Sequence, residues 1–108
     1  MLNYKMYLDQ INEMISRIED STKDISLEKF AENKDLWDST LLRLQVIGES
    51  INNIPYEIKK KNKQVKWKIF AKLRNFISHK YISVNKDIIW NIIKTQIPEL
   101  KSQIEGVK

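Results

Sequence analysis

The chain has 108 residues, of which 42% are hydrophobic and 31% are charged, and it contains no cysteine. This length fits one domain, which we expect over residues 1–108, and the lack of cysteine excludes a disulfide scaffold, a thiolate zinc site and a cysteine nucleophile. No uninterrupted apolar run exceeds three residues, whereas a membrane-spanning helix needs about 20, so no membrane partner is expected. The N-terminal residues MLNYKMYLDQ lack the apolar core of a signal peptide, which favours a cytoplasmic location.

Glycine and proline are scarce, with two of each in the chain. Sheets joined by tight turns usually need more of them, because they supply the special backbone dihedral angles of turns. We therefore predict an all-α fold, an up-and-down bundle of four long helices plus one short helix.

The first long helix is predicted over about residues 3–20 and the short one over about 27–31, with Ser26 as the N-cap of the short helix. Six apolar residues of the first helix share one face at steps of three and four: Tyr4, Tyr7, Ile11, Met14, Ile15 and Ile18.

The next long helix is predicted over about residues 35–54 and ends at Pro55. Glycine in mid-helix is unfavourable by about 1 kcal/mol relative to alanine, so Gly48 predicts the close approach of a neighbouring backbone. The buried stripe of this helix has near-heptad spacing and consists of Trp37, Leu41, Leu44, Gly48 and Ile51.

The lysine-rich stretch from Tyr56 to Lys66 has no sustained apolar period and is predicted to be an exposed connection. A helix over about residues 67–78 follows, with Trp67, Phe70, Leu73 and Ile77 buried.

A loop of about residues 80–84 then leads to Asn85, the predicted N-cap of the last helix. Pro98 is expected to kink or restart that helix near Ile97. Its buried face should contain Ile89, Ile92, Ile93, Ile97, Leu100 and Ile104.

Charge is distributed unevenly along the chain, with a net charge of −4 over residues 1–54 and of +9 over residues 55–108. The stretch from Ile58 to Lys86 contains ten basic residues and no acidic one. Such a block is typical of a surface that binds a polyanion, although a solvated lysine-rich face is the commoner reason for a run of charge. In a composition this rich in lysine, a single lysine is weak evidence for a binding site. The arginines are stronger evidence, because only three of the 19 basic residues are arginines.

The one histidine, His79, lies in this acid-free stretch, five residues after Arg74 and two before Tyr81. A lone histidine is usually structural, but an imidazole titrates near neutral pH and can act as acid or base when RNA is cleaved by its own 2′-hydroxyl. Arginine offers a fixed fork of donors that matches phosphate oxygens. Residues five apart on a helix lie about 140° apart, so Arg74 and His79 converge poorly in one chain unless the helix ends between them.

The segment from Arg74 to Tyr81 resembles the Arg-x-x-x-x-His-x-Tyr motif of HepT-like toxins in the HEPN superfamily, and Asn75 matches the Arg-Asn start common in that family. The resemblance extends to the segment VIGES at 46–50, to Trp67 at the start of the motif helix and to DIIW at 87–90. It covers nearly the whole chain in the same order and spacing. Lys66 and Ser83 stand where a proline and a glycine are frequent, and these departures concern loops only.

The resemblance implies a helical, homodimeric ribonuclease that works without a metal or another cofactor. Arg74 and His79 of two protomers would meet in one cleft. It further implies the toxin of a toxin–antitoxin pair, whose partner is a small nucleotidyltransferase of the MNT type. That partner would transfer AMP from ATP to the hydroxyl of Tyr81 and thereby silence the toxin.

Several other residues have candidate roles around the motif. Asn75 could hold a phosphate or orient the histidine, and Lys72 and Lys80 are candidate RNA-binding residues. Glu49 could orient His79, pair with Arg74, or be an ordinary surface glutamate. Arg43 is expected to face solvent, Tyr56 to be an ordinary loop tyrosine rather than a base-stacking one, and the three tryptophans to pack in the core. No cluster of carboxylates or histidines with metal-ligand spacing lies near the motif, which suits a metal-free reaction.

The alternative to a ribonuclease is a non-catalytic helical module whose basic face binds nucleic acid or an acidic protein. Both hypotheses predict polyanion binding that weakens with salt. They differ at His79, because catalysis requires this residue, whereas binding through lysines does not.

Overall fold

The apolar stripes of the sequence become three long helices and a fourth long helix that is divided into segments. The computed structural model describes residues 3–107, which form helices and turns and, within that range, no strand. The long helices are α1 (Lys5–Thr22), α3 (Lys34–Asn53), α5 (Trp67–Lys80) and the segmented last helix, formed by α6 (Lys86–Asn91), η2 (Ile92–Gln96) and α7 (Ile97–Glu105). The shorter elements are α2 (Leu27–Glu32), α4 (Tyr56–Lys61) and the 3₁₀ turn η1 (Tyr81–Ser83).

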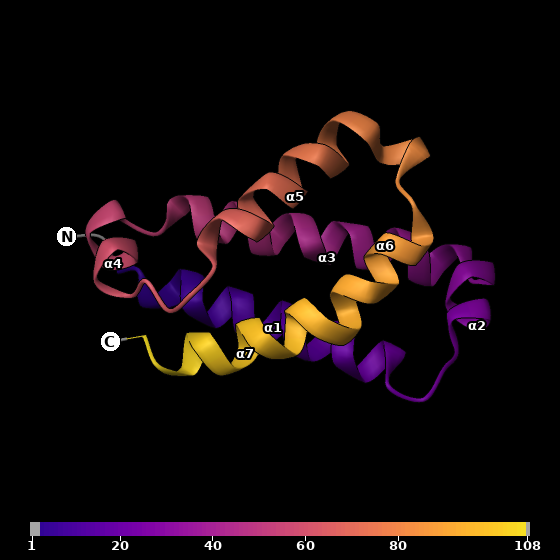
Figure 1. Ribbon diagram of the computed structural model, residues 1–108, viewed down its shortest axis with the longest axis horizontal. Coiled ribbons are helices and arrows are strands. Elements are labelled where there is room, and N and C mark those ends of the chain that lie inside the picture. The colour runs from indigo at the N-terminus through magenta and orange to yellow at the C-terminus, as the bar shows by residue number, and fades with distance from the viewer. Residues whose placement is uncertain (1–2, 108) are drawn as a thin grey trace.

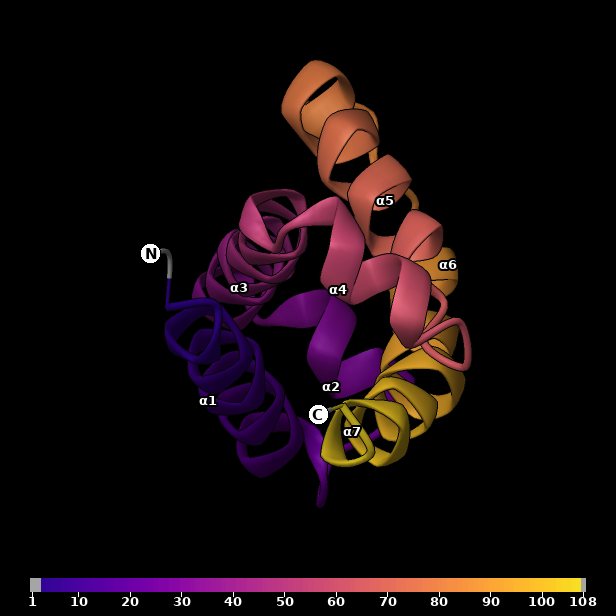
Figure 2. The same ribbon diagram turned by 90° about the vertical axis from the view of Figure 1, so that its left-hand side faces the viewer.

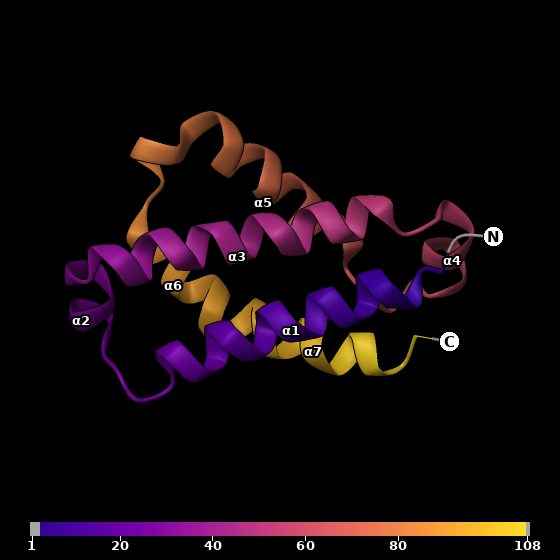
Figure 3. The same ribbon diagram turned by 180° about the vertical axis from the view of Figure 1, so that it is seen from behind.

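Helices α1 and α3 lie side by side and antiparallel, and α7 runs along α1 (Figures 1 and 3). Helix α5 crosses the outer side of α3, and its C-terminal half rises away from the rest of the bundle. The short helices α2 and α4 lie at opposite ends of the bundle (Figures 1 and 3), so they lie one behind the other in the end-on view of Figure 2. The predicted all-α bundle is confirmed. Among residues 3–107, no helix combines the length and the apolar content that crossing a membrane requires.

Each long helix turns its predicted stripe toward one common core. The side chains at its centre are almost completely buried and come from all four long helices: Ile11, Ile15, Ile18, Leu41, Leu44, Ile51, Phe70, Ile77, Ile89, Ile97 and Leu100. Trp67 is buried as predicted, while Trp37 and Trp90 are half-buried and pack around Phe30 of α2. The β-branched isoleucines fit these helices because burial outweighs their slightly lower helix propensity.

Both predicted N-caps are confirmed. The Oγ of Ser26 accepts a hydrogen bond from the backbone N–H of Lys29 at 3.2 Å. The Oδ1 of Asn85 accepts from the N–H groups of Asp87 and Ile88, at 2.8 and 3.1 Å. These side chains satisfy donors that the first turn of a helix leaves without a partner, and thereby fix where the helices begin.

The stretch from Tyr56 to Lys66 is mostly exposed, as predicted, but its first part forms helix α4, which the sequence pattern did not predict. Only two apolar side chains of this segment, Ile58 and Val65, reach the core, and two positions are too few to produce a period. The segment is also held by Asn62, whose Nδ2 donates to the carbonyl of Ile58 at 2.8 Å and whose own carbonyl accepts from Trp67 Nε1 at 3.1 Å.

Pro98 does restart the last helix, as its position predicted. Residues Ile92–Gln96 form a π-helical segment, and α7 begins at Ile97 with Pro98 in its first turn. Proline has no N–H and its ring crowds the carbonyl four residues earlier, so the regular hydrogen-bond ladder cannot continue through this position.

Basic side chains bind backbone carbonyls of neighbouring helices. Lys94 Nζ donates to the carbonyl of Thr22 at the end of α1, at 3.2 Å, and Lys86 Nζ to that of Ala31 near the end of α2, at 2.8 Å. A cation at these positions complements the partial negative charge of a helix C-terminus. The last turn of α1 has no basic residue of its own.

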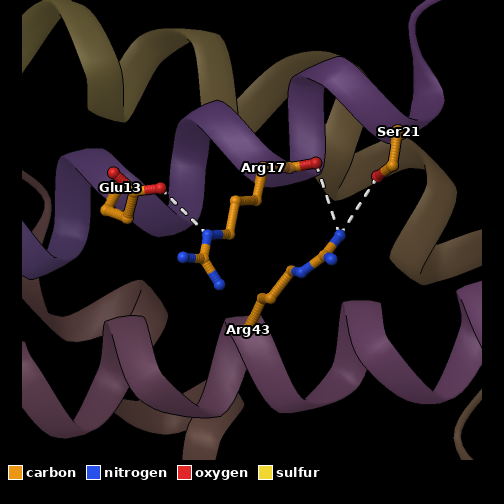
Figure 4. A network of polar contacts seen from close by, with 4 residues as sticks. All are labelled: Glu13, Arg17, Ser21 and Arg43. Carbon is orange, nitrogen blue, oxygen red and sulfur yellow. Dashed lines mark hydrogen bonds and ion pairs between the residues drawn. The ribbon is translucent and has the colours of Figure 1, made fainter.

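The expectation that Arg43 simply faces solvent was wrong. Its Nη1 donates to the carbonyl of Arg17 at 3.3 Å and to Ser21 Oγ at 3.2 Å, which joins α3 to α1 (Figure 4). Arg17 itself forms a neighbouring ion pair with Glu13 at 2.9 Å. The long side chain of Arg43 reaches from α3 to α1. The sequence alone does not show how these two helices are aligned, so this contact could not be predicted from it.

Gly48 lies where α5 crosses α3. A Cβ atom at this position would lie 2.7 Å from the backbone carbonyl oxygen of Phe70 and still closer to Cβ of Arg74. The predicted close approach is therefore confirmed, and the neighbouring backbone belongs to the helix that carries the motif.

Replacing Gly48 with alanine should destabilise the fold, because the added methyl group meets backbone atoms of α5 that cannot move without moving the helix. Overpacking of this kind costs typically about 1–3 kcal/mol, which exceeds the gain of up to about 1 kcal/mol in helix propensity. Thermal unfolding should show a melting temperature lower by several degrees.

The matched control for this prediction is Gly106→Ala, whose added Cβ would have its nearest neighbours at 3.6 Å. We expect Gly106→Ala to melt no lower than the unmodified chain. Equal melting temperatures for the two variants would contradict the role assigned to Gly48.

Candidate functional site

Helix α5 carries both motif residues without interruption. It runs from Trp67 to Lys80, two residues beyond the predicted end, and η1 follows directly. Because the helix does not end between Arg74 and His79, their Cα positions are separated by about 140° around the axis and by roughly 7.5 Å along it. The motif is therefore spread over two faces of one helix.

Arg74 lies on the side of α5 that faces α3, and its guanidinium is held by two neighbours. Its Nη2 pairs with Glu49 Oε2 at 3.0 Å, and its Nη1 donates to Asn75 Oδ1 at 3.2 Å. Of the partners that the sequence allowed for Glu49, the structure shows Arg74. The side chains of Arg74 and Glu49 are 37% and 53% exposed, so this ion pair remains accessible to an incoming anion.

His79 lies on the outer surface of the same helix and is exposed. Within residues 3–107, no hydrogen bond or ion pair restrains its imidazole. Within one chain, Arg74 is therefore held in place by its neighbours and His79 is exposed to solvent. The two side chains do not lie close enough together to form one site.

Tyr81 begins η1, and its hydroxyl donates a hydrogen bond to Asp38 Oδ1 of α3 at 2.8 Å. The side chain is 42% exposed, so the phenol is accessible as well as anchored. The hydrogen bond to Asp38 raises the pKa of Tyr81, and partial desolvation and the negative charge of Asp38 add to this effect. A carboxylate that accepts the phenolic proton favours the neutral phenol over the phenolate.

Helix α3 supplies a row of partners to the motif that sequence reasoning missed, apart from Glu49. Asp38, Gln45 and Glu49 lie on one face of α3 at intervals of seven and four residues, and they bind Tyr81, Ser78 and Arg74 respectively. The Gln45 Nε2 to Ser78 Oγ hydrogen bond is 3.0 Å long. Asp38 and Gln45 precede their partners by more than 30 residues, and nothing local in the sequence marks them.

The basic residues near the motif do not form one surface. Lys72 lies on the same side of α5 as Asn75 and His79, because these positions are separated by three and four residues. Lys80 follows His79 directly and therefore lies about 100° further round the helix. Both lysines are exposed.

In the described part of the chain, side chains that could bind a metal ion together are not grouped in this way. Among residues 3–107, no group of three or more histidine, cysteine, aspartate or glutamate residues is placed so that it could hold a metal ion. The motif itself presents a guanidinium, an imidazole and a phenol, and carboxylates bind the guanidinium and the phenol.

The fold and this arrangement define a class: a small helical bundle that presents an arginine and a histidine five residues apart on one helix. The family model "Ribonuclease HepT-like" matches residues 11–107. This protein belongs to the HepT-like family, and its resemblance to that branch of the HEPN superfamily is confirmed.

Curated relatives agree with the family model. The chain is 32% identical over 106 residues to "Probable ribonuclease HepT" of Thermococcus cleftensis, a match that covers 98% of this chain and 96% of that protein. It is 35% identical over 101 residues to a protein of Caldanaerobacter subterraneus subsp. tengcongensis named "Putative RNase", covering 94% of this chain and 90% of the relative.

A third relative is longer than this chain. The Methanocaldococcus jannaschii protein named "Gamma-glutamylcyclotransferase and putative RNase" is 39% identical over 100 residues, which cover 93% of this chain and 45% of the relative. This chain therefore spans less than half the length of that relative. No solved structure matched the chain significantly.

Asp38→Asn should lower the pKa of Tyr81 toward the ordinary value for tyrosine. The substitution removes the negative charge that disfavours the phenolate and weakens the hydrogen bond that stabilises the phenol. Absorbance titration of tyrosinate formation should show one tyrosine ionising at lower pH than in the unmodified chain, and Tyr81→Phe should abolish that component.

Asp35→Asn is the matched control, since Asp35 is an exposed carboxylate one turn earlier on the same helix. It should leave the titration of Tyr81 unchanged. An Asp38→Asn curve that coincides with the Asp35→Asn curve would show that the Asp38–Tyr81 hydrogen bond does not persist in solution.

Proposed function

We propose that this protein is a metal-independent endoribonuclease, the toxin of a toxin–antitoxin pair that acts in the cytoplasm. The observation that carries the proposal is the anchored Arg74 beside Glu49 and Asn75, on the same helix as the exposed His79, in a chain of the HepT-like family. The curated relatives whose names include ribonuclease or RNase support the same activity.

The residues suit RNA cleavage by the internal 2′-hydroxyl. In that reaction the 2′-oxygen attacks the adjacent phosphorus, the bond to the 5′-oxygen breaks, and one proton leaves the nucleophile while another reaches the leaving group. His79 serves as the proton acceptor or donor, because an imidazole exchanges protons near neutral pH. Arg74 binds the phosphate oxygens, on which negative charge accumulates in the transition state. Asn75 and Glu49 hold the guanidinium in position, and Lys72 and Lys80 attract the RNA backbone.

A homodimer completes the site in this proposal. Arg74 and His79 of one chain lie about 140° apart on an uninterrupted helix, so they cannot both face one phosphate closely. A second protomer whose α5 lies against the first would place the histidine of one chain near the arginine of the other. The exposed C-terminal half of α5, which rises from the bundle, is accessible for such a contact.

Regulation in this proposal depends on Tyr81 and on a nucleotidyltransferase antitoxin of the MNT type. The phenolic oxygen of Tyr81 attacks the α-phosphorus of ATP, pyrophosphate leaves, and the phenolic proton passes to a base. Asp38 already accepts that proton in a hydrogen bond of 2.8 Å and is the group placed to receive it. The attached AMP adds a bulky anion near Arg74, where it repels the phosphates of the substrate.

The purified protein should cleave RNA in the presence of a chelator. His79→Ala and Arg74→Ala should each lower the rate by at least about 100-fold, the lower range for removing a general acid–base or an electrostatic group. Cleavage of a labelled RNA on a denaturing gel measures this, with circular dichroism as the check that each variant folds.

Asn12→Ala, which trims an exposed polar side chain on α1, is the control and should cleave as the unmodified chain does. Equal cleavage by the unmodified chain and by His79→Ala would favour the non-catalytic binding module instead.

Mixing the His79→Ala and Arg74→Ala chains should restore part of the activity, since a heterodimer contains one intact composite site. A fully active monomer at micromolar concentration would contradict the homodimer.

Co-expression with the partner nucleotidyltransferase should add AMP to Tyr81 and suppress cleavage. Tyr81→Phe should remain an active ribonuclease that the partner cannot modify, because only the accepting hydroxyl is lost. Intact-protein and peptide mass spectrometry locate the modification. Modification of Tyr4, Tyr7 or Tyr56 alone, or none with an active partner and ATP, would contradict this assignment.

A further inference from the structure

A cavity of about 630 Å³ lies between the end of α3, helix α4 and the start of α5. Among the described residues, its lining contains no acidic side chain and five lysines: Lys59, Lys60, Lys63, Lys66 and Lys68. Its apolar lining comes from Ile51, Tyr56, Val65, Trp67 and Ala71. A cavity that combines an apolar wall with several amines suits a ligand that is both flat and anionic.

Most of these lysines have no counter-ion among the residues that the structure describes. Lys66 pairs with Glu99 at 2.9 Å, but within residues 3–107 no carboxylate forms an ion pair with the other four. Lys59 is half-buried, and its desolvation lowers its pKa. A partly buried amine without a carboxylate partner gains more from a bound phosphate than a fully hydrated lysine does.

An aromatic ring stands at the edge of the cavity. Tyr56, the first residue of α4, lines it and is 72% exposed, the largest exposed fraction of any aromatic residue in the described part of the chain. An unpaired nucleobase stacks on such a ring, whereas a base inside a duplex has no free face to offer. The sequence suggested an ordinary loop tyrosine here, but the structure shows a helical position at the entrance of a lysine-lined cavity.

A row of exposed side chains leads from the cavity to the motif along one face of α5. Lys68, Lys72, Asn75 and His79 follow one another at intervals of four, three and four residues, and all four are exposed. These intervals keep the side chains on one side of a helix. They extend roughly 16 Å from the edge of the cavity to the histidine. A single RNA strand that follows this row passes from the cavity to the motif.

We propose that this cavity binds one nucleotide of the single-stranded RNA substrate, at a distance from the bond that is cleaved. The base stacks on Tyr56, and the neighbouring phosphates bind the lysines without a described counter-ion, Lys59, Lys60, Lys63 and Lys68. This inference rests on the proposed function for the identity of the ligand, but it concerns binding and not cleavage. The substrate is then unpaired RNA that is long enough to reach from α4 to the motif.

The test measures binding to the full chain with His79→Ala, so that the probe stays intact. Fluorescence anisotropy with a labelled single-stranded RNA of about 12 nucleotides, within the range of known single-strand sites, gives the dissociation constant. Adding Tyr56→Ala should weaken binding roughly tenfold to a hundredfold, the effect of losing one base–aromatic stack. Tyr56→Phe should retain the affinity, because the ring remains.

Lysines provide a second, matched comparison. Lys63→Ala should weaken binding and reduce its salt dependence, because one phosphate contact is lost. Lys34→Ala, an exposed lysine at the far end of α3, should change neither. Duplex RNA of the same sequence should bind without any effect of Tyr56→Ala, since its bases are already stacked.

Three results would overturn the inference: Tyr56→Ala binding as tightly as its parent, the same loss with duplex RNA, or ATP displacing the RNA at concentrations typical of a nucleotide site. The last would indicate a site for free nucleotides. If RNA is bound through Tyr56 but never cleaved by the unmodified chain, the proposed function fails and the cavity assignment stands. If RNA is cleaved and Tyr56→Ala affects neither binding nor cleavage, the reverse holds.

Discussion

The crossing of α5 over α3 at Gly48 is the contact from which the geometry of the motif follows. Only a residue without a Cβ allows the carbonyl of Phe70 and the side-chain base of Arg74 to come so close to α3. At this separation Glu49, the next residue after Gly48, reaches the guanidinium of Arg74 directly. The same crossing fixes the register in which Gln45 and Asp38 meet Ser78 and Tyr81.

The basic side chains in the second half of the chain fall into two groups with different physical roles. Lys86 binds a carbonyl of α2, and Lys66 and Arg74 bind carboxylates, so these side chains stabilise the fold or the motif. The lysines that line the cavity beside α4 and the row along α5 mostly lack such partners within the described residues, so these are the basic side chains that remain available to a polyanion. A count of charges along the sequence cannot separate these two groups, because the distinction lies in what each side chain reaches.

Local patterns in the sequence predicted most of the fold. The helical stripes follow a period of three to four residues, and Ser26 and Asn85 act on neighbours two or three positions away, so short-range information suffices for both. Helix α4 escaped prediction because it contributes too few apolar residues to make a pattern. Asp38, Gln45 and the contacts of Arg43 escaped because they depend on how whole helices are packed. The motif residues were found through their chemistry and the family resemblance, and their roles in catalysis remain predictions.

The π-helical segment Ile92–Gln96 sets the phase of the last helix. The buried residues Ile89, Ile93 and Ile97 are four apart, and two such steps in a regular α-helix would turn the third residue about 80° away from the first. The wider turn of a π segment, with its hydrogen bonds one residue further apart, removes this drift. The π segment therefore contains one residue more than an α-helix that turns through the same angle. Pro98 follows two residues after this segment and its ring excludes the regular ladder, so the wider turn both keeps the phase of α7 and leaves room for the proline.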